Sequence, residues 1–235
     1  MDERSSKDQF LSHMVSEIQT PLKAILRFSD TLLKNPYDNT NNEKYLKLIH
    51  HSAKNIDNII KDVSDISHIQ NGTFSINIKK INLREFLSQN FELFRSKAKE
   101  KSIRYSIKFG NNLPKYIQTD ENRLSQVISN LLGNAIKFTK KDGAVKLEVV
   151  FDIKNSILKV FIDDNGIGIP DSKKENIFKP YIKDNSSINF EDTRTGLGLF
   201  ISLSIIELLN GKIEFESTEK KGSTFNFEIP VKTDN

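Results

Sequence analysis

The sequence of 235 residues contains no cysteine. Disulfide bonds, thiolate metal sites and cysteine nucleophiles are therefore excluded, and the composition fits a reducing compartment. No apolar run approaches the roughly 20 residues that a membrane-spanning helix needs, and the N-terminal residues MDERSSKDQF do not resemble a signal peptide. We expect a soluble, cytoplasmic segment, for which attachment to a membrane would require segments outside this sequence.

Blocks of like charge are also lacking. The 35 Lys and Arg residues are interleaved with 31 Asp and Glu residues, and the formal net charge is only +4. Proteins that bind nucleic acid usually gather their basic residues on one face or helix. We therefore expect no nucleic-acid partner for this chain.

Residues 1–72 have the apolar spacing of two amphipathic helices joined by the turn-rich segment NPYDNTNN. In the first helix the spaced positions are Leu11, Met14, Ile18, Pro21, Ile25, Phe28 and Leu32. In the second they are Tyr45, Ile49, Ser52, Ile56, Ile59, Val63 and Ile66. This pattern predicts an antiparallel helical hairpin, which forms a four-helix bundle as a homodimer or packs on the second half of its own chain.

Residues 73–235 have a different pattern, in which short alternating stretches are separated by helical runs. The expected strands are FSINI, RYSIKF, AVKLEVVF, ILKVFIDD, KIEFES and TFNFEIP, and the expected helices are REFLSQNFELFRSKAKEK, ENRLSQVISNLLGNAIKF and GLFISLSIIELL. This arrangement predicts an α+β fold, in which helices cover one face of a mixed sheet. We place the domain boundary at residue 72.

Three motifs in the second half carry groups suited to a nucleotide. In NLLGNAIKF, Asn130, Asn134 and Lys137 share one face of a helix, so two amide oxygens and an ammonium point the same way. DDNGIGIP places Asp164 and two glycines directly after a strand, and TGLGLF opens a helix with two more glycines. Each motif alone is also typical of ordinary helices, turns and linkers.

In this order the motifs resemble the N, G1 and G2 boxes of the histidine-kinase catalytic domain, and IFKPY, with Phe178, resembles its F box. That domain has the Bergerat-type ATP-binding fold, which is also found in DNA gyrase and heat-shock chaperones. Residues 1–72 are similar to the family's dimerisation and phosphoacceptor domain. The resemblance therefore spans nearly the whole chain and implies a sensor histidine kinase of a two-component phosphorelay.

The resemblance implies that the second half binds ATP and Mg²⁺. By it, Asn134 and Asn130 would coordinate the metal ion, and Lys137 would contact a phosphate group. Hydrolytic relatives have a glutamate, which activates water, at the position of Asn130. Since asparagine cannot take up that proton, the site is expected to hold ATP for transfer rather than for hydrolysis.

The same resemblance assigns the adenine side of the site. Asp164 would accept a hydrogen bond from the adenine amino group, and Gly166 and Gly168 would line the pocket. Thr224, in the stretch KGSTFNF, would lie near the adenine.

On the phosphate side, Gly196 and Gly198 would close over the phosphates beneath a lid formed by residues 179–195. The family usually has a glycine-rich start to this motif, whereas here Arg194 and Thr195 precede it. Arg194 would contact a phosphate group or stiffen the lid, and both alternatives stay open.

The first helix departs from the family at the acceptor. The family sequence His-Glu-x-x-Thr-Pro-Leu is replaced by SEIQTPL, so Ser16 occupies the position of the acceptor histidine. A serine hydroxyl needs an activating base, and its phosphate ester is too stable to be passed on easily. We therefore expect direct autophosphorylation to be weak or absent. Val15 and Gln19 also differ from the family residues, which favours natural divergence over an engineered change.

Three further residues keep other activities open. His13 lies one turn before Ser16 on the outer side and would be a displaced acceptor. Glu17 and Thr20 retain the Glu-x-x-Thr pair, which the resemblance links to dephosphorylation of the partner receiver domain of a response regulator. The alternatives are therefore a receiver phosphatase or a catalytically silent partner that forms heterodimers with an intact kinase.

Overall fold

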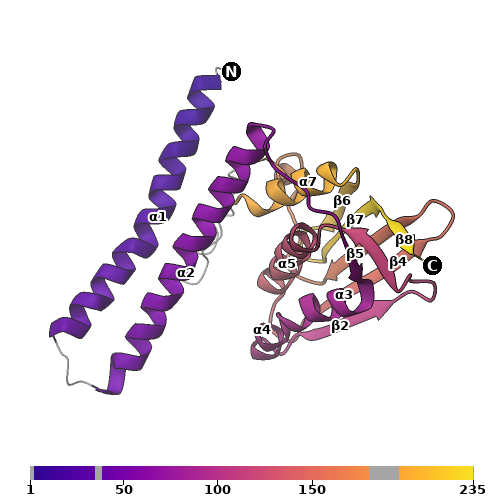
Figure 1. The fold of residues 1–235 in the computed structure, drawn as a ribbon. Helices are drawn as coiled ribbons and strands as arrows, with labels where there is room; N and C mark the ends of the chain where they lie inside the picture. The colour runs from indigo at the N-terminus through magenta and orange to yellow at the C-terminus, as the bar shows by residue number, and fades with distance from the viewer. Residues whose placement is uncertain (1–2, 35–38, 180–195, 235) are drawn as a thin grey trace. The chain divides into compact units, whose positions relative to one another are not determined.

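The computed structural model describes residues 3–34, 39–179 and 196–234 (Figure 1). The chain divides into two compact units, one of Met1–Phe74 with Lys179–Gly198 and one of Ser75–Phe178 with Leu199–Asn235. In the described part of the chain, no helix combines the length and the apolar character needed to cross a membrane.

The first unit contains the expected helical hairpin, built from α1 (Glu3–Lys34) and α2 (Asn39–Gln70). The seam residues that the structure describes are buried or half-buried, because their heptad spacing places them on one face of each helix. The rings of Phe28 and Tyr45 stack across the hairpin with centroids 5.6 Å apart. At the end of α2, Gly72 adopts φ +66°, and its N–H donates to the carbonyl of Ile69 at 3.1 Å.

An apolar strip on α1 stays exposed. Val15, Leu22 and Leu26 of α1 are 54%, 43% and 56% exposed, and Leu46 and Ile60 of α2 are exposed as well. A helix that faces only solvent on one side normally carries polar residues there. This strip is therefore apolar surface that the two helices do not cover for each other.

The second unit is built on a five-stranded mixed sheet, which confirms the expected α+β class. Only the β2–β4 pair is parallel; the other neighbours are antiparallel. In spatial order the strands are β2 (Arg104–Phe109), β4 (Ala144–Asp152), β5 (Ile157–Asp164), β7 (Gly222–Pro230) and β6 (Lys212–Thr218).

Helices cover one face of this sheet (Figure 1). They are α3 (Leu83–Glu92), α4 (Arg95–Glu100), α5 (Glu121–Phe138) and α7 (Gly198–Leu208), and a short helix, α6 (Asp171–Lys174), follows β5. The core lies between the two layers, where Leu131 and Leu132 of α5 pack with Leu147, Val160 and Phe227 from the sheet, all at most 1% exposed. Alternation along the strands sends every second side chain into this layer.

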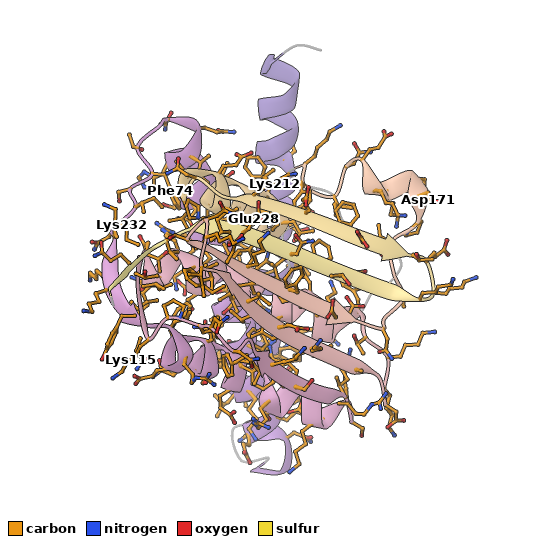
Figure 2. The ribbon with its side chains drawn as sticks, turned by 90° about the vertical axis from the view of Figure 1, so that its right-hand side faces the viewer. Phe74, Lys115, Asp171, Lys212, Glu228 and Lys232 are labelled. Atoms are coloured by element: carbon orange, nitrogen blue, oxygen red, sulfur yellow. The ribbon has the colours of Figure 1, made fainter. Side chains whose placement is uncertain are left out.

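The opposite face of the sheet is polar (Figure 2). Its side chains pair across neighbouring strands, as in Lys108–Glu148 at 2.7 Å and Lys159–Glu228 at 3.0 Å. Such exposed pairs contribute at most about 1 kcal/mol each. The apolar core of the second unit therefore lies on the helix-covered face of the sheet.

A small antiparallel sheet completes the second unit, with strands β1 (Lys79–Asn82), β3 (Tyr116–Thr119) and β8 (Lys232–Asp234). Two details of the sequence prediction are wrong here. FSINI (residues 74–78) is not a strand but precedes β1, and the single helix expected over residues 84–101 is divided into α3 and α4. The division falls at residues 93–94, which form a turn, and the Leu93 side chain there is 70% exposed rather than buried in the core.

Candidate functional site

Helix α5 is fixed firmly at both ends. At its start, Asp120 accepts hydrogen bonds from the N–H of Arg123 at 3.0 Å and from the N–H of Asn77 at 2.7 Å. At its end, the ammonium of Lys101 donates to the carbonyls of Ile136 at 2.9 Å, Lys137 at 2.8 Å and Thr139 at 3.1 Å. A cation at this end also complements the helix dipole. These contacts hold the polar face of α5 in a defined position.

That polar face carries the three residues expected on the magnesium and phosphate side. Asn130, Asn134 and Lys137 are half-buried, whereas the apolar residues on the opposite face of α5, such as Val127 and Leu131, are buried in the core. The side-chain amide of Asn130 donates from Nδ2 to Ser202 Oγ of α7 at 2.9 Å. This bond orients the amide, so that its carbonyl oxygen is left as an acceptor. The Lys137 ammonium lies 4.7 Å from the centre of the Phe138 ring.

The ends of β5, β7 and β6 form a row of polar residues on the helix-covered face. Asp164 is in register with Ser223, and Ser223 is in register with Ser217. Two residues further into the strands, the same face carries Ile162, Phe225 and Phe215. The polar row therefore borders these three apolar side chains, which we call the apolar floor.

Asp164 is the acid of this row, and the pKa of its carboxyl group is perturbed. Burial raises the pKa of its carboxyl group to about 6, and the neighbouring Asp163 adds to the rise, whereas hydrogen bonds from the N–H groups of Gly166 and Ser223 oppose it. The N–H of Gly166 donates to Asp164 Oδ1 at 2.8 Å. At neutral pH the group is therefore mostly an ionised acceptor in a partly desolvated position.

The loop after Asp164, residues 165–170, is called the glycine loop and lies tightly against its surroundings. A Cβ atom on Gly166 would lie 2.7 Å from Asp164 Oδ1, and one on Gly168 would overlap the carbonyl of Thr218. Gly168 also has φ +65°, and the N–H of Lys220 donates to the carbonyl of Ile167 at 2.6 Å. Glycine is therefore needed at both positions expected to line the adenine pocket.

Aromatic rings extend the floor toward the F-box residue. Phe225 stacks on Phe215 with centroids 5.6 Å apart, and Phe178 meets Phe215 edge to face at 5.9 Å. Flat, apolar surfaces of this kind suit the face of a purine base.

Thr224, which was expected near the adenine, faces away from the row that contains Asp164. Side chains alternate along a strand, so Thr224 lies on the face opposite Asp164, where its hydroxyl donates to Asp163 Oδ1 at 2.8 Å. Ser223 is the residue beside Asp164. Sequence reasoning missed it because the strand register, which decides the face, is not visible in the motif.

Of the two glycines expected near the phosphates, Gly198 is the first residue of α7, and Gly196 before it adopts φ +69°. The Asn130–Ser202 hydrogen bond ties the following part of α7 to α5. Arg194 and lid residues 180–195 lie outside the described residues.

On the hairpin, the predicted acceptor region lies on α1. Ser16 and Thr20 are exposed and Glu17 is half-buried. The Thr20 hydroxyl donates to the backbone carbonyl of Ser16 at 3.3 Å. His13 belongs to α1, but its side chain lies outside the described residues.

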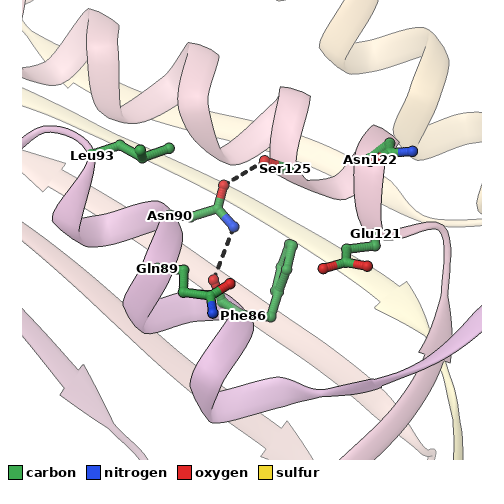
Figure 3. A pocket seen from close by; sticks show the side chains of 7 residues that line it. All are labelled: Phe86, Gln89, Asn90, Leu93, Glu121, Asn122 and Ser125. Carbon is green, nitrogen blue, oxygen red and sulfur yellow. Dashed lines mark hydrogen bonds between the residues drawn. The ribbon is translucent and has the colours of Figure 1, made fainter.

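A separate cavity of about 260 Å³ lies between α3 and the start of α5 (Figure 3). Asn90 spans it, donating to the carbonyl of Phe86 at 2.9 Å and accepting from the Ser125 hydroxyl at 2.6 Å. None of the predicted site residues line this cavity.

Within residues 3–34, 39–179 and 196–234, no group of His, Cys, Asp and Glu side chains could hold a metal ion by itself. The donor set on α5 instead consists of amide oxygens and an ammonium. Such a set can complete the shell of a Mg²⁺ ion that is held mainly by the oxygens of a polyphosphate.

Family models match both parts of the chain. Residues 6–72 match the "His Kinase A (phospho-acceptor) domain", and residues 119–233 match the "Histidine kinase-, DNA gyrase B-, and HSP90-like ATPase". The two matches take up the hairpin and most of the second unit.

Individual proteins that resemble this chain belong to the same family as the two family models. The autoinducer 2 sensor kinase/phosphatase LuxQ of Vibrio vulnificus is 35% identical over 97% of this chain, although the chain spans only 27% of LuxQ. The catalytic domain of histidine kinase ThkA is 32% identical, with a TM-score of 0.57, and matches 66% of this chain and 97% of that domain. ThkA in complex with the response regulator protein TrrA is 26% identical, with a TM-score of 0.64, over 97% of this chain and 64% of that one. The chain therefore belongs to the histidine kinase family, whose phosphoacceptor-type and ATP-binding domains it carries.

Proposed function

We propose that the second unit binds Mg-ATP for phosphoryl transfer in a phosphorelay, and that transfer to the chain's own first helix is weak or absent. The observation that carries the proposal is the row Asp164–Ser223–Ser217 beside the glycine loop, with Asp164 held as an acceptor by two backbone N–H groups. A fixed acceptor above an apolar floor is what recognition of a purine amino group requires.

The residues of α5 fit the metal side. The carbonyl oxygens of Asn130 and Asn134 would complete the coordination of Mg²⁺, and Lys137 would neutralise phosphate charge after leaving its place over the Phe138 ring. The bound ion would supply charge neutralisation of the polyphosphate. Asn130 has no basic group that could activate water, so the protein's part is to bind and orient the nucleotide rather than to hydrolyse it. Gly196 and Gly198 would approach the phosphates at the start of α7.

The hairpin supports weak autophosphorylation. Ser16 is exposed at the acceptor position, but a serine hydroxyl group is a poor nucleophile at neutral pH, and its phosphate ester is too stable to be passed on easily. The exposed strip of Val15, Leu22 and Leu26 supports pairing with a second copy of the hairpin. The complex of ThkA with a response regulator supports a receiver domain as the partner of that bundle.

A nucleotide titration tests the binding part. We expect Asp164→Asn to weaken Mg-ATP binding by roughly 100-fold, because one acceptor oxygen is replaced by an NH2 group, which must then face either the backbone N–H donors or the purine amino group. Asp163→Asn is the matched control, since Asp163 faces the other side of the sheet and contacts Thr224. Equal affinity of the Asp164→Asn and Asp163→Asn variants for ATP would contradict the site.

Incubation with ATP labelled at the γ-phosphate tests the transfer part. We expect little acid-labile label on the protein at saturating ATP. Strong label that is stable to alkali would contradict weak autophosphorylation, and its location at His13 would identify a displaced acceptor.

A second candidate is a receiver-domain phosphatase that uses Glu17 and Thr20. It is favoured by the retained pair on α1, where Thr20 is exposed and Glu17 is half-buried, and by the similarity to LuxQ, a sensor kinase/phosphatase. Loss of dephosphorylation in Thr20→Ala, measured on a phosphorylated receiver domain, would support this activity. Unchanged dephosphorylation in both Thr20→Ala and Glu17→Ala would remove it.

A further inference from the structure

The hydroxyl group of Ser217 makes three hydrogen bonds at the end of the polar row. It accepts from the N–H of Ile169 at 2.8 Å and donates to the carbonyl of Gly222 at 3.1 Å. The hydroxyl oxygen of Ser223 lies 2.9 Å away. All three partners belong to segments that surround Asp164.

The directions of these bonds follow from the capacity of a hydroxyl group, which has one proton to donate and two lone pairs that accept. The proton of Ser217 is used by Gly222, so Ser223 must be the donor to Ser217. The Ser217 oxygen thereby uses its full capacity. Removing it would leave the N–H of Ile169 and the carbonyl of Gly222 without this partner.

The partners of Ser217 lie on both sides of the acceptor. Ile169 lies in the glycine loop that begins directly after Asp164, and Ser223 donates its backbone N–H to the Asp164 carboxylate. Gly222 lies so close to Asp164 that a Cβ atom there would overlap the Asp164 carbonyl. One hydroxyl group therefore connects the loop and the strand that together set the position of the carboxylate.

We propose that Ser217 is a positioning residue for purine selection: through Ile169 and Ser223 it holds Asp164 where a 6-amino purine is favoured over a 6-oxo purine. The inference rests on the proposed binding of ATP to this unit. A 6-amino group donates to the carboxylate, whereas a 6-oxo group presents a second acceptor to it. A fixed carboxylate enforces this difference, and one that can turn away relaxes it.

The test compares the binding of Mg-ATP and Mg-ITP to the full chain by calorimetry. We expect Ser217→Ala to weaken ATP binding by about tenfold and ITP binding by less than about threefold. The ratio of the ATP affinity to the ITP affinity should therefore fall. Ser217→Thr retains a hydroxyl group and should restore the selectivity. Ser204→Ala is the control for loss of a buried hydroxyl group, because Ser204 bonds only back to the Phe200 carbonyl of its own helix at 3.1 Å.

Each outcome bears on a definite claim. If the unaltered chain binds ATP and Ser217→Ala retains its selectivity, or loses affinity for both nucleotides equally, the positioning role is overturned while the binding function stands. If the unaltered chain binds no ATP, the proposed function itself fails, and the inference with it. Should Ser217→Ala not fold, Ser223→Ala tests the same link, and unchanged selectivity in that variant overturns the proposal.

Discussion

The polar row of Asp164, Ser223 and Ser217 is held in place by backbone and hydroxyl groups from three segments of the chain. On the outer side of α1, the Ser16 side chain is exposed on a helix whose fold does not depend on it. A substitution in the first region disturbs several bonds at once, whereas a substitution in the second changes one reactive group. Under the proposed function, acceptor chemistry can therefore be lost from the hairpin while its fold and the candidate nucleotide site are kept.

Restoring the acceptor is the most direct way to test this comparison. Ser16→His should increase autophosphorylation by at least roughly 100-fold, because a neutral imidazole at the exposed position is a nucleophile that needs no additional base. The measurement is acid-labile label transferred from ATP. Ser16→Gln is the control, since it adds a side chain of similar length without a nucleophile.

A Ser16→His variant that still binds Mg-ATP but gains no autophosphorylation would also be informative. It would mean that the first helix has lost more than its acceptor, and Val15 and Gln19, which also differ from the family, are the residues to restore next.

Glycine substitutions compare the loop after Asp164 with the end of α2. Gly168 and Gly72 have nearly the same φ, +65° and +66°, but a Cβ atom would overlap Thr218 at Gly168 and meet nothing within 4 Å at Gly72. Gly72→Ala should cost about 1 kcal/mol of stability from backbone strain alone. Gly168→Ala should cost about 2–3 kcal/mol more, because the loop must also leave the β6–β7 turn.

Chemical denaturation of each variant measures these free energies, with ATP titration as a second readout. Gly168→Ala should weaken ATP binding and Gly72→Ala should not. Equal losses of stability in the two variants would mean that the contact with Thr218 contributes nothing.

The sequence predicted the strongly patterned elements well. The fold class and the family are confirmed, and α5 and β5 have the bounds expected from ENRLSQVISNLLGNAIKF and ILKVFIDD. In these segments the apolar period, the capping Asp120 and the motif all favour the same structure. The short strands β1, β3 and β8 were missed or misplaced, because three or four residues carry too little alternation to be distinguished from a loop.

The site was predictable in its parts but not in its connections. Asp164 at a strand end and the glycines after it follow from the motif. The partners of Asp164 do not, because Ser223 and Ser217 are brought beside it by strand register between segments about 50 to 60 residues away. For the same reason the sequence suggested Thr224, which the register turns to the other face.

The pH dependence of ATP binding tests whether Asp164 is an ionised acceptor. Because its pKa lies at about 6, we expect ATP affinity to fall by about tenfold per pH unit below that value, as the protonated carboxyl loses its acceptor role. A nucleotide whose purine has no 6-substituent is the control, because its phosphates titrate alike but need no acceptor. Parallel pH profiles for the two nucleotides would exclude this role.

The free protein should show the opposite trend from the same group. A pKa raised on folding means that the folded state favours the proton. The contribution of Asp164 to stability is therefore fully present below its ordinary pKa near 3.8, and it is lost as pH rises through about 6. Asp164→Asn should remove this part of the pH dependence of unfolding, measured by denaturation between pH 4 and pH 7, whereas Asp163→Asn should retain most of it, because Asp163 makes the smallest contribution to the raised pKa.

The smallest expected effect lies at the end of α5, where Lys101 donates to three carbonyl groups. Lys101→Met keeps the length of the side chain but removes the ammonium, and should lower stability by about 1–2 kcal/mol. The carbonyl of Phe138, in the same turn, accepts from the N–H of Ile167 at 3.2 Å, so the loss should also loosen the glycine loop and weaken ATP binding by a few-fold. Lys108→Met, which removes an exposed partner of Glu148 on the polar face, should change neither property measurably. Equal effects of the two variants would show that the end of α5 is no more sensitive than the open face of the sheet.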